Sequence, residues 1–181
     1  ALPGSFSWPV SMCQLKRCLL VERVPLEGTE QELVLVNLHL EAYDSDGGGK
    51  KAQTKVLYEL LQREYEKGNY VIAGGDFNQT FDTVPEDLYP LKFTDHFMPG
   101  RIDTSVLGEG WTFANDVSAP TSRLLNEPYD PDSENTQYYM LDGFILSPNV
   151  TLTAVKTLDE GFAYTDHNPV RVDVVLDTQN D

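Results

Sequence analysis

The feature that most constrains the fold is a strand, a helix and a second strand that follow one another without a long break. ELVLVNLHL, Glu32–Leu40, is rich in branched apolar residues, and its run Leu33–Val36 is apolar on both faces, which is typical of a strand inside a sheet. KAQTKVLYELLQREYEKG predicts a helix that ends at Gly68, a natural capping residue. YVIAGG, Tyr70–Gly75, is a short second strand. A crossover of this length joins parallel neighbours, so the two strands are expected to run parallel in one sheet.

The predicted helix has one apolar side. Its apolar residues fall at helical spacing, and they are Ala52, Val56, Leu57, Leu60, Leu61 and Tyr65. The preceding segment EAYDSDGGGKK, Glu41–Lys51, contains three consecutive glycines and is expected to be a loop. The helix is therefore expected to pack its apolar side on the sheet.

The remaining elements are mostly predicted strands. Lys16–Leu26 is expected to pair with Glu32–Leu40 as a hairpin through the turn EGTE. Gln79–Gln137 is rich in Pro, Asp, Asn and Thr and predicts long loops with short strands around TFAND. Three further strands are predicted at Tyr138–Ser147, in TLTAVKTL, and in the closing VRVDVVL with its alternating valines. The predicted fold class is α/β, with mixed sheets and outer helices in a single domain, 1–181.

The charge of the chain limits the substrates to which it is suited. The sequence has 13 Lys and Arg against 29 Asp and Glu, a formal net charge of -16. Long nucleic acids are bound largely through neutralisation of phosphates by Lys and Arg, so the balance favours a small substrate or cations held by carboxylates. No apolar run approaches the length needed to cross a membrane.

Polar side chains stand where the strands of the crossover end. Asn37 and His39 are two residues apart and therefore point to one face of their strand. Asp76 and Asn78, in GGDFN, follow the next strand directly. Sheets with helical crossovers place ligands at the carboxyl ends of their strands, so these four side chains are candidates for one site. Taken alone, GGDFN is more often a turn, since Gly, Asp and Asn all tolerate turn geometry.

Two further strands carry candidates of the same kind. Asp142 lies inside the apolar YYMLDGFIL, and Asp166 and His167 immediately precede the last strand. Carboxylate and amide oxygens suit Mg²⁺, and His can act as a general base when a carboxylate orients its ring. Each motif alone is more often structural, but the ordered set is far more specific.

The ordered set NLHL, GGDFN, LDGFILS and TDHNPV resembles the endonuclease/exonuclease/phosphatase superfamily, which has the deoxyribonuclease I-like fold. The resemblance runs from Lys16 to Leu176. It implies a portion of a four-layer α/β sandwich, and hydrolysis of phosphodiesters or phosphomonoesters with a divalent metal, Mg²⁺ or alternatively Mn²⁺. The wording LVNLHLEAY and EYEKGNYVIAGGDFN is similar to that of bacterial members of unassigned substrate with an N-terminal membrane anchor, which would place the domain outside the cytoplasm.

The resemblance also implies a role for each candidate. His167 would be the general base or would hydrogen-bond the phosphate, with Asp142 orienting its ring. Asp166 would help to hold the metal. Asp76 would position the attacking water or serve the metal and the leaving group.

On the substrate side, the resemblance implies contacts to the phosphate. His39 and Asn37 match the N-x-H-L element, and His39 would donate to the scissile phosphate. Asn78 would stabilise phosphate oxygens.

The chain departs from the superfamily in one respect that bears on activity. An Asn-bearing first strand and a Glu metal ligand, usually in a Q-E pair, are not found, and Glu22 comes too late in the order. The chain is thus expected to be the C-terminal portion of a longer protein and to be catalytically inactive as given. An uncovered sheet face would favour self-association.

The sequence is compatible with several functions. The leading one is a metal-dependent phosphoesterase acting on a small phosphodiester, a lipid head group or an inositol phosphate rather than on long nucleic acid. A noncatalytic binding module on the same scaffold is the alternative, and an unrelated α/β binding domain is a third. Outside the motifs, Asp95 and His96 are expected at the surface, Trp111 in packing, and Arg123 in a salt bridge.

Overall fold

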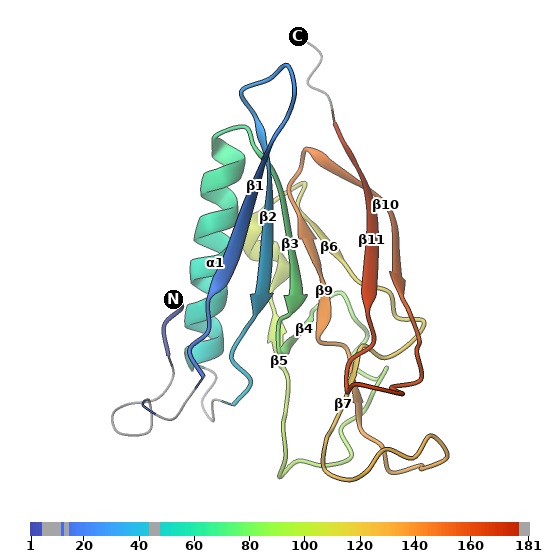
Figure 1. Cartoon of the computed structure of the whole chain (residues 1–181). Helices are drawn as coiled ribbons and strands as arrows, with labels where there is room; N and C mark the ends of the chain where they lie inside the picture. Colours follow the sequence, from blue (N-terminus) through green and yellow to red (C-terminus); the bar gives the residue numbers. More distant parts are fainter. Residues whose placement is uncertain (5–11, 13–14, 44–47, 178–181) are drawn as a thin grey trace.

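The computed structural model describes residues 1–4, 12, 15–43 and 48–177. Its centre is a five-stranded sheet in the order β1-β2-β3-β9-β6 (Figure 1). The strands are β1 (Leu19–Pro25), β2 (Glu32–His39), β3 (Tyr70–Asp76), β6 (Thr112–Ala114) and β9 (Asp142–Leu146). β2 and β3 run parallel and the other neighbours antiparallel, which confirms the predicted hairpin, the predicted crossover and the interior position of β2.

The helix α1 (Gly48–Glu66) covers one face of this sheet, as Figure 1 shows. Leu57 and Leu61, which belong to this helix, are fully buried, as predicted. The loop predicted over Glu41–Lys51 is wrong at its C-terminal end, because α1 already begins at Gly48. Val56 stays exposed, since the buried side of the helix is rotated to include two polar residues, Gln53 and Glu64.

The buried polar residues of α1 have partners that explain their position. Gln53 Oε1 accepts from the backbone N–H of Glu41 at 2.9 Å, and its Nε2 donates to Pro3 O at 2.8 Å. Glu64 receives Arg23 at 2.9 Å and Lys67 at 3.0 Å. These bonds satisfy groups that would otherwise be costly to bury, and so they override the apolar pattern.

The other face of the sheet is partly covered by an antiparallel pair, β10 (Val150–Thr157) and β11 (Val170–Leu176) (Figure 1). Val172, Val174 and Leu152 of this pair pack against Ile72 and Leu146 of the sheet. The predicted alternation of the last strand is confirmed by these contacts. The chain therefore has a helix layer, a central sheet and a two-stranded layer.

The segment between β3 and β9 consists of loops and short elements, as expected. They are β4 (Gln79–Phe81), β5 (Gly100–Ile102), the 3-10 helix η2 (Thr104–Leu107), β7 (Ser122–Arg123) and β8 (Tyr138–Tyr139). β4 pairs with β5, and β7 pairs with β8. Trp111 packs edge-to-face on Tyr65 with ring centroids 5.6 Å apart, in the packing role predicted for it.

The single strand predicted over Tyr138–Ser147 is wrong, because it divides into β8 and β9. A side-chain contact explains the break between β8 and β9. The backbone N–H groups of Leu141 and Asp142 both donate to Thr121 Oγ1, at 2.9 and 3.1 Å, rather than to a neighbouring strand. Asp142 is consequently the first residue of β9 and not an interior one.

The half of the sheet formed by β1 and β2 keeps an apolar face that the described residues do not cover. Leu20, Val24 and Leu35 lie there with 67%, 40% and 37% of their surface exposed. The strand register places all three on one side, because Leu20 pairs with Asn37 and Val24 pairs with Leu33. No helix among the described residues is long and apolar enough to cross a membrane.

Candidate active site

Three of the predicted residues form one row across the central sheet. His39 of β2 is in register with Asp76 of β3, and Asp76 is in register with Asp142 of β9. β9 runs antiparallel to β3, so its first residue reaches the edge where β2 and β3 end. The strand directions thus gather residues that are distant in the sequence.

Two glycines of the GGDFN motif make this row possible. Gly75 has φ +141°, and a side chain there would collide with the carbonyl of Leu38. A side chain at Gly74 would enter the ring of Phe144 on β9. The missing side chains thus allow β2, through Leu38, and β9, through Phe144, to approach the backbone of β3 closely.

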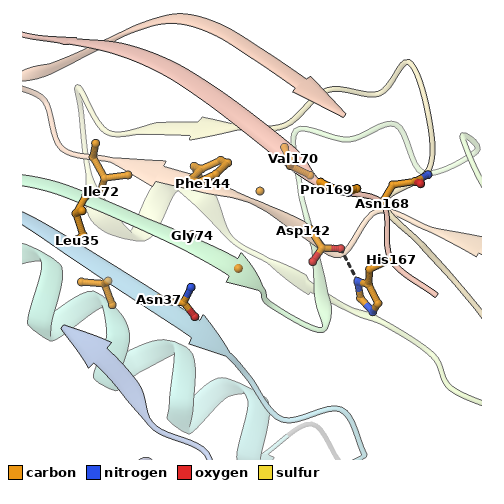
Figure 2. Close-up of a pocket in the computed structure, with 13 residues that line it drawn as sticks. Leu35, Asn37, Ile72, Gly74, Asp142, Phe144, His167, Asn168, Pro169 and Val170 are labelled. Carbon is orange, nitrogen blue, oxygen red and sulfur yellow. Dashed lines mark hydrogen bonds and ion pairs between the residues drawn. The ribbon is translucent and has the colours of Figure 1, made fainter. Parts of the chain in front are cut away.

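His167 lies against the row from the loop that precedes β11. Its Nδ1 is 2.9 Å from Asp142 Oδ2, and its Nε2 is 3.9 Å from Asp76 Oδ2. Figure 2 shows the bond between Asp142 and His167. A carboxylate at Nδ1 orients the ring so that Nε2 is the nitrogen that can exchange a proton, which is the geometry of an oriented general base.

The electrostatic surroundings favour the charged form of His167. Burial of the ring lowers its pKa, but the hydrogen bond with Asp142 and the negative charges of Asp142, Asp76 and Asp166 outweigh burial, so the pKa is raised. The ring is therefore a stronger base than a free imidazole.

Asp76 is held in an unusual state. Its Oδ1 accepts from Asn78 N at 2.8 Å and its Oδ2 from Asn78 Nδ2 at 3.1 Å. Burial, followed by repulsion from Asp142, raises the pKa of Asp76 to about 6 in spite of these bonds. A partly buried carboxylate with a raised pKa is characteristic of functional sites.

Asn78 adopts a left-handed backbone, φ 51°, and is buried. Its amide nitrogen also donates to Leu40 O at 2.9 Å, so both amide hydrogens are engaged within the protein. The structure thus makes Asn78 the residue that holds Asp76. Its predicted contact with phosphate oxygens stays a prediction.

The two predicted substrate residues on β2 face the same side. Asn37 belongs to a cleft of about 520 Å³ that runs past Gly74 and Phe144 to Asp142 and His167 (Figure 2). His39 lies beside it, with Nε2 at 3.3 Å from Asp76 Oδ2. Burial, with the nearby charges of Arg17 and His167, lowers the pKa of His39. A mainly neutral His39 is suited to donating a hydrogen bond.

The carboxylates present only part of a metal site. No group of three or more His, Cys, Asp or Glu side chains that could hold an ion is found among the described residues. Asp76, Asp142 and Asp166 nevertheless surround His167, and repulsion between the first two raises the pKa of Asp76. A cation at this edge of the sheet would relieve that repulsion. The oxygen donors are of the kind that Mg²⁺ prefers, but the described residues supply too few of them for a complete site.

Two arginines near the site were missed or misjudged from the sequence. Arg17 acts on His39 and Asp76 through its charge, and its buried Nε has no hydrogen-bond partner. Arg123 shares a small pocket with Asn78 and His167, and its Nε also lacks a partner. The predicted salt bridge of Arg123 is wrong for the part of the chain that the structure describes, because its guanidinium stacks over Tyr129 at 4.7 Å. No periodicity or motif marks either residue.

The second Asp-His pair of the sequence does not join the site. Asp95 and His96 bond to each other at 2.7 Å on an exposed loop, as predicted. Proximity in sequence alone thus does not make such a pair functional.

Comparison with known proteins identifies the architecture. No protein-family model and no curated protein matches the chain. Among solved structures, D. rerio TDP2 in complex with a single-strand DNA product is 19% identical, with a TM-score of 0.57 over 88% of this chain and 62% of that one. An endonuclease/exonuclease/phosphatase from Beutenbergia cavernae is 17% identical, with a TM-score of 0.57 over 91% of this chain and 40% of that one. The chain has the endonuclease/exonuclease/phosphatase fold.

A third solved structure with this fold is the human Nocturnin catalytic domain with a bound sulfate, which is 15% identical with a TM-score of 0.55. It is matched over 90% of this chain and 54% of its own length. The chain thus spans between 40% and 62% of these three structures. The expected endonuclease/exonuclease/phosphatase fold is confirmed, as a portion of the larger architecture.

Proposed function

We propose that this chain carries the base-containing part of a phosphoesterase that hydrolyses phosphate esters with water. The observation that supports this most directly is the Asp142–His167 pair at 2.9 Å, facing the partly buried Asp76 on a fold named for nucleases and phosphatases. Each of the four sequence motifs supplies at least one side chain to the edge of the sheet where this pair lies. A purely structural role would not require a carboxylate with a pKa raised to about 6.

The chemistry follows from the positions of the side chains. Nε2 of His167 takes a proton from water as the water oxygen bonds to phosphorus, while Asp142 stabilises the imidazolium that forms. The ester P–O bond on the opposite side breaks, and the leaving oxygen takes up a proton. Asp76, 3.9 Å from Nε2, is placed to orient the water or its ion.

A divalent metal is proposed as the cofactor, Mg²⁺ or alternatively Mn²⁺. Asp76 and Asp166 are the residues of this chain that would hold it. The bound ion would stabilise negative charge on the phosphate oxygens. Because Mg²⁺ is commonly held by one or two carboxylates with water and further oxygen ligands, this set is a partial one, and hydrolysis by the chain alone is expected to be very slow or absent.

The proposed substrate is a small phosphate ester or a lipid head group rather than long nucleic acid. The net charge of -16 opposes binding to an extended polyanion. Local recognition of a phosphate is still available through Arg17 and Arg123. Among the described residues neither has a carboxylate partner, whereas Arg23, Arg63 and Arg171 all do. Arginines left without ion pairs beside a reaction centre are suited to phosphate oxygens.

The experiment that tests this function is a hydrolysis assay in Mg²⁺ on bis(p-nitrophenyl) phosphate and p-nitrophenyl phosphate. It is made with this chain and with a longer protein that contains it. Activity in the longer protein, lost in His167→Ala while the protein stays folded, is the expected result. Retention of full activity by that variant would overturn the assignment.

A noncatalytic binding module is the second candidate. The lack of a three-residue ligand group among the described residues favours it. A longer protein that binds inorganic phosphate but hydrolyses neither ester would support the binding module over the enzyme.

A further inference from the structure

The strand β7 has only two residues, yet it lies directly against the candidate base. Ser122 forms an isolated antiparallel bridge with His167, and the backbone N–H of Arg123 donates to Asp166 O at 3.0 Å. On its other side, Ser122 is in register with Tyr139 of β8. The backbone of Ser122 is thus fixed from both sides.

The side chain of Ser122 reaches the reacting nitrogen of the ring. Its Oγ lies 3.2 Å from Nε2 of His167, closer than the 3.9 Å that separates Nε2 from Asp76 Oδ2. Ser122 is 3% exposed, so its hydroxyl has little competition from solvent. Both ring nitrogens therefore have a protein partner, Asp142 at Nδ1 and Ser122 at Nε2.

We propose that Ser122 is a positioning residue that fixes the ring of His167, with Nε2 held near Ser122 Oγ and the carboxylate of Asp76. The inference rests on the proposed function, in which Nε2 takes the proton from water. Neutral His167 keeps its hydrogen on Nδ1, toward Asp142, and Nε2 accepts from the Ser122 hydroxyl. When water enters, the hydroxyl turns its hydrogen away so that the Nε2 lone pair can take the proton of the water. The Nε2–H that forms then donates to the same oxygen, because a hydroxyl can exchange donor and acceptor roles and a carboxylate cannot.

The three side chains have the order of a Ser-His-carboxylate triad, so a nucleophilic role must be weighed. A nucleophile needs an open path to the substrate and an anion-stabilising site beside it. Ser122 is buried, and the carboxylate of Asp76 lies 3.9 Å from the nitrogen to which Ser122 bonds. A negatively charged intermediate on Ser122 would be repelled there. The geometry thus favours positioning over attack.

The first test uses this chain itself and needs no activity. Histidine side chains labelled with ¹⁵N are observed by NMR at an alkaline pH where His167 is neutral, with EDTA present. Only three histidines occur, so assignment by His39→Gln and His96→Gln is direct. Ser122→Ala is expected to shift the Nε2 signal of His167 toward that of a free acceptor nitrogen. Ser122→Thr, which keeps the hydroxyl, is expected to retain the original shift.

Ser105→Ala is the matched control, because the Ser105 hydroxyl donates to Asp103 Oδ1 at the start of η2, outside the candidate site. It is expected to leave the His167 signals unchanged. An unchanged Nε2 signal in folded Ser122→Ala overturns the proposal. Phosphonylation of Ser122 by a fluorophosphonate probe, detected by mass spectrometry, also overturns it in favour of a nucleophile.

The second test is kinetic and uses whichever form of the protein hydrolyses bis(p-nitrophenyl) phosphate. Loss of ring positioning in Ser122→Ala is expected to lower kcat by roughly 10- to 100-fold with little change in KM, and Ser122→Thr is expected to recover most of it. An unchanged kcat would contradict the positioning role. If no form is active, the proposed function fails, while the NMR result still decides whether Ser122 holds the ring.

Discussion

Asp142 Oδ2 lies 2.9 Å from Nδ1 of His167, although 25 residues separate them in the chain. The contact depends on β9 running antiparallel to β3, which brings the first residue of β9 to the edge where His167 lies. The carboxylate fixes one nitrogen of the ring and helps to raise its pKa. This pair is therefore the most sensitive point at which to test the proposed chemistry.

Asp142→Asn is expected to lower kcat for phosphate-ester hydrolysis by about 10²- to 10⁴-fold, because an amide can stabilise neither the required tautomer nor the imidazolium. Steady-state kinetics on the active form measure this. Asp95→Asn is the matched control, since it breaks an exposed Asp-His bond of 2.7 Å outside the site. Equal kinetics in the two variants would contradict the role of Asp142.

Asp76→Asn is expected to stabilise the chain at neutral pH while abolishing activity. The pKa of Asp76 is about 6 in the folded chain, against 3.8 for an unperturbed Asp side chain. The ionised carboxylate is therefore less stable in the folded chain than in the unfolded chain. A shift of this size corresponds to about 2 to 3 kcal/mol of unfolding free energy above pH 6. Urea unfolding of both proteins at neutral pH measures the difference.

The pH dependence of that gain has a definite sign. Well below pH 3.8, Asp76 is protonated in both states and contributes no destabilisation. As the pH rises toward 6, the unfolded chain ionises first, and the native protein loses stability relative to Asp76→Asn. A gain that is absent at neutral pH and present only at pH 4 would refute this account.

The sequence predicts the β2-α1-β3 unit well, because two apolar strand runs flank a period-3.6 pattern that persists over the length of the helix. It also predicts Asn37 and His39 on one face, since they are two apart on one strand. Ser122 could not be found in this way, because a two-residue strand has no period and its partner is 45 positions away. Gln53 and Glu64 show the same limit, since their burial depends on distant partners.

Mg²⁺ is expected to bind this chain weakly and to stabilise it. At tenfold over its Kd the ion contributes about 1.4 kcal/mol, or roughly 3 to 6 °C in Tm for a chain of this length. Thermal unfolding against MgCl₂ measures the effect. Asp166→Asn should abolish it, and Asp132→Asn, in an exposed loop, should not. A rise in Tm that persists in Asp166→Asn would place the ion elsewhere.

Gly75→Ala is expected to destabilise the fold by roughly 3 kcal/mol or more, because strain at φ +141° is added to a collision with the Leu38 carbonyl. Gly28→Ala separates the two effects. Gly28 has φ +80° with no atom near its missing side chain, so that change should cost only about 1 kcal/mol. Urea unfolding compares them, and equal losses would show that the close approach of Leu38 is unimportant.

The uncovered face of β1 and β2 is expected to make the chain self-associate. Leu20, Val24 and Leu35 are exposed on one side of a sheet whose other half is covered by β10 and β11. Apolar area gained by pairing two such faces favours a dimer, although Glu22 on the same face limits its strength.

Sedimentation velocity over a range of concentrations tests this. Leu35→Lys is expected to shift the chain toward monomer, because a charge at the centre of the face would be buried without a partner. Val56→Lys places the same charge at a residue of the same 37% exposure on α1, on the opposite layer, and should leave association unchanged. If both variants associate like the original chain, the contact lies on another surface. If the chain stays monomeric at all concentrations, the exposed apolar face of β1 and β2 does not drive association, and the prediction is wrong.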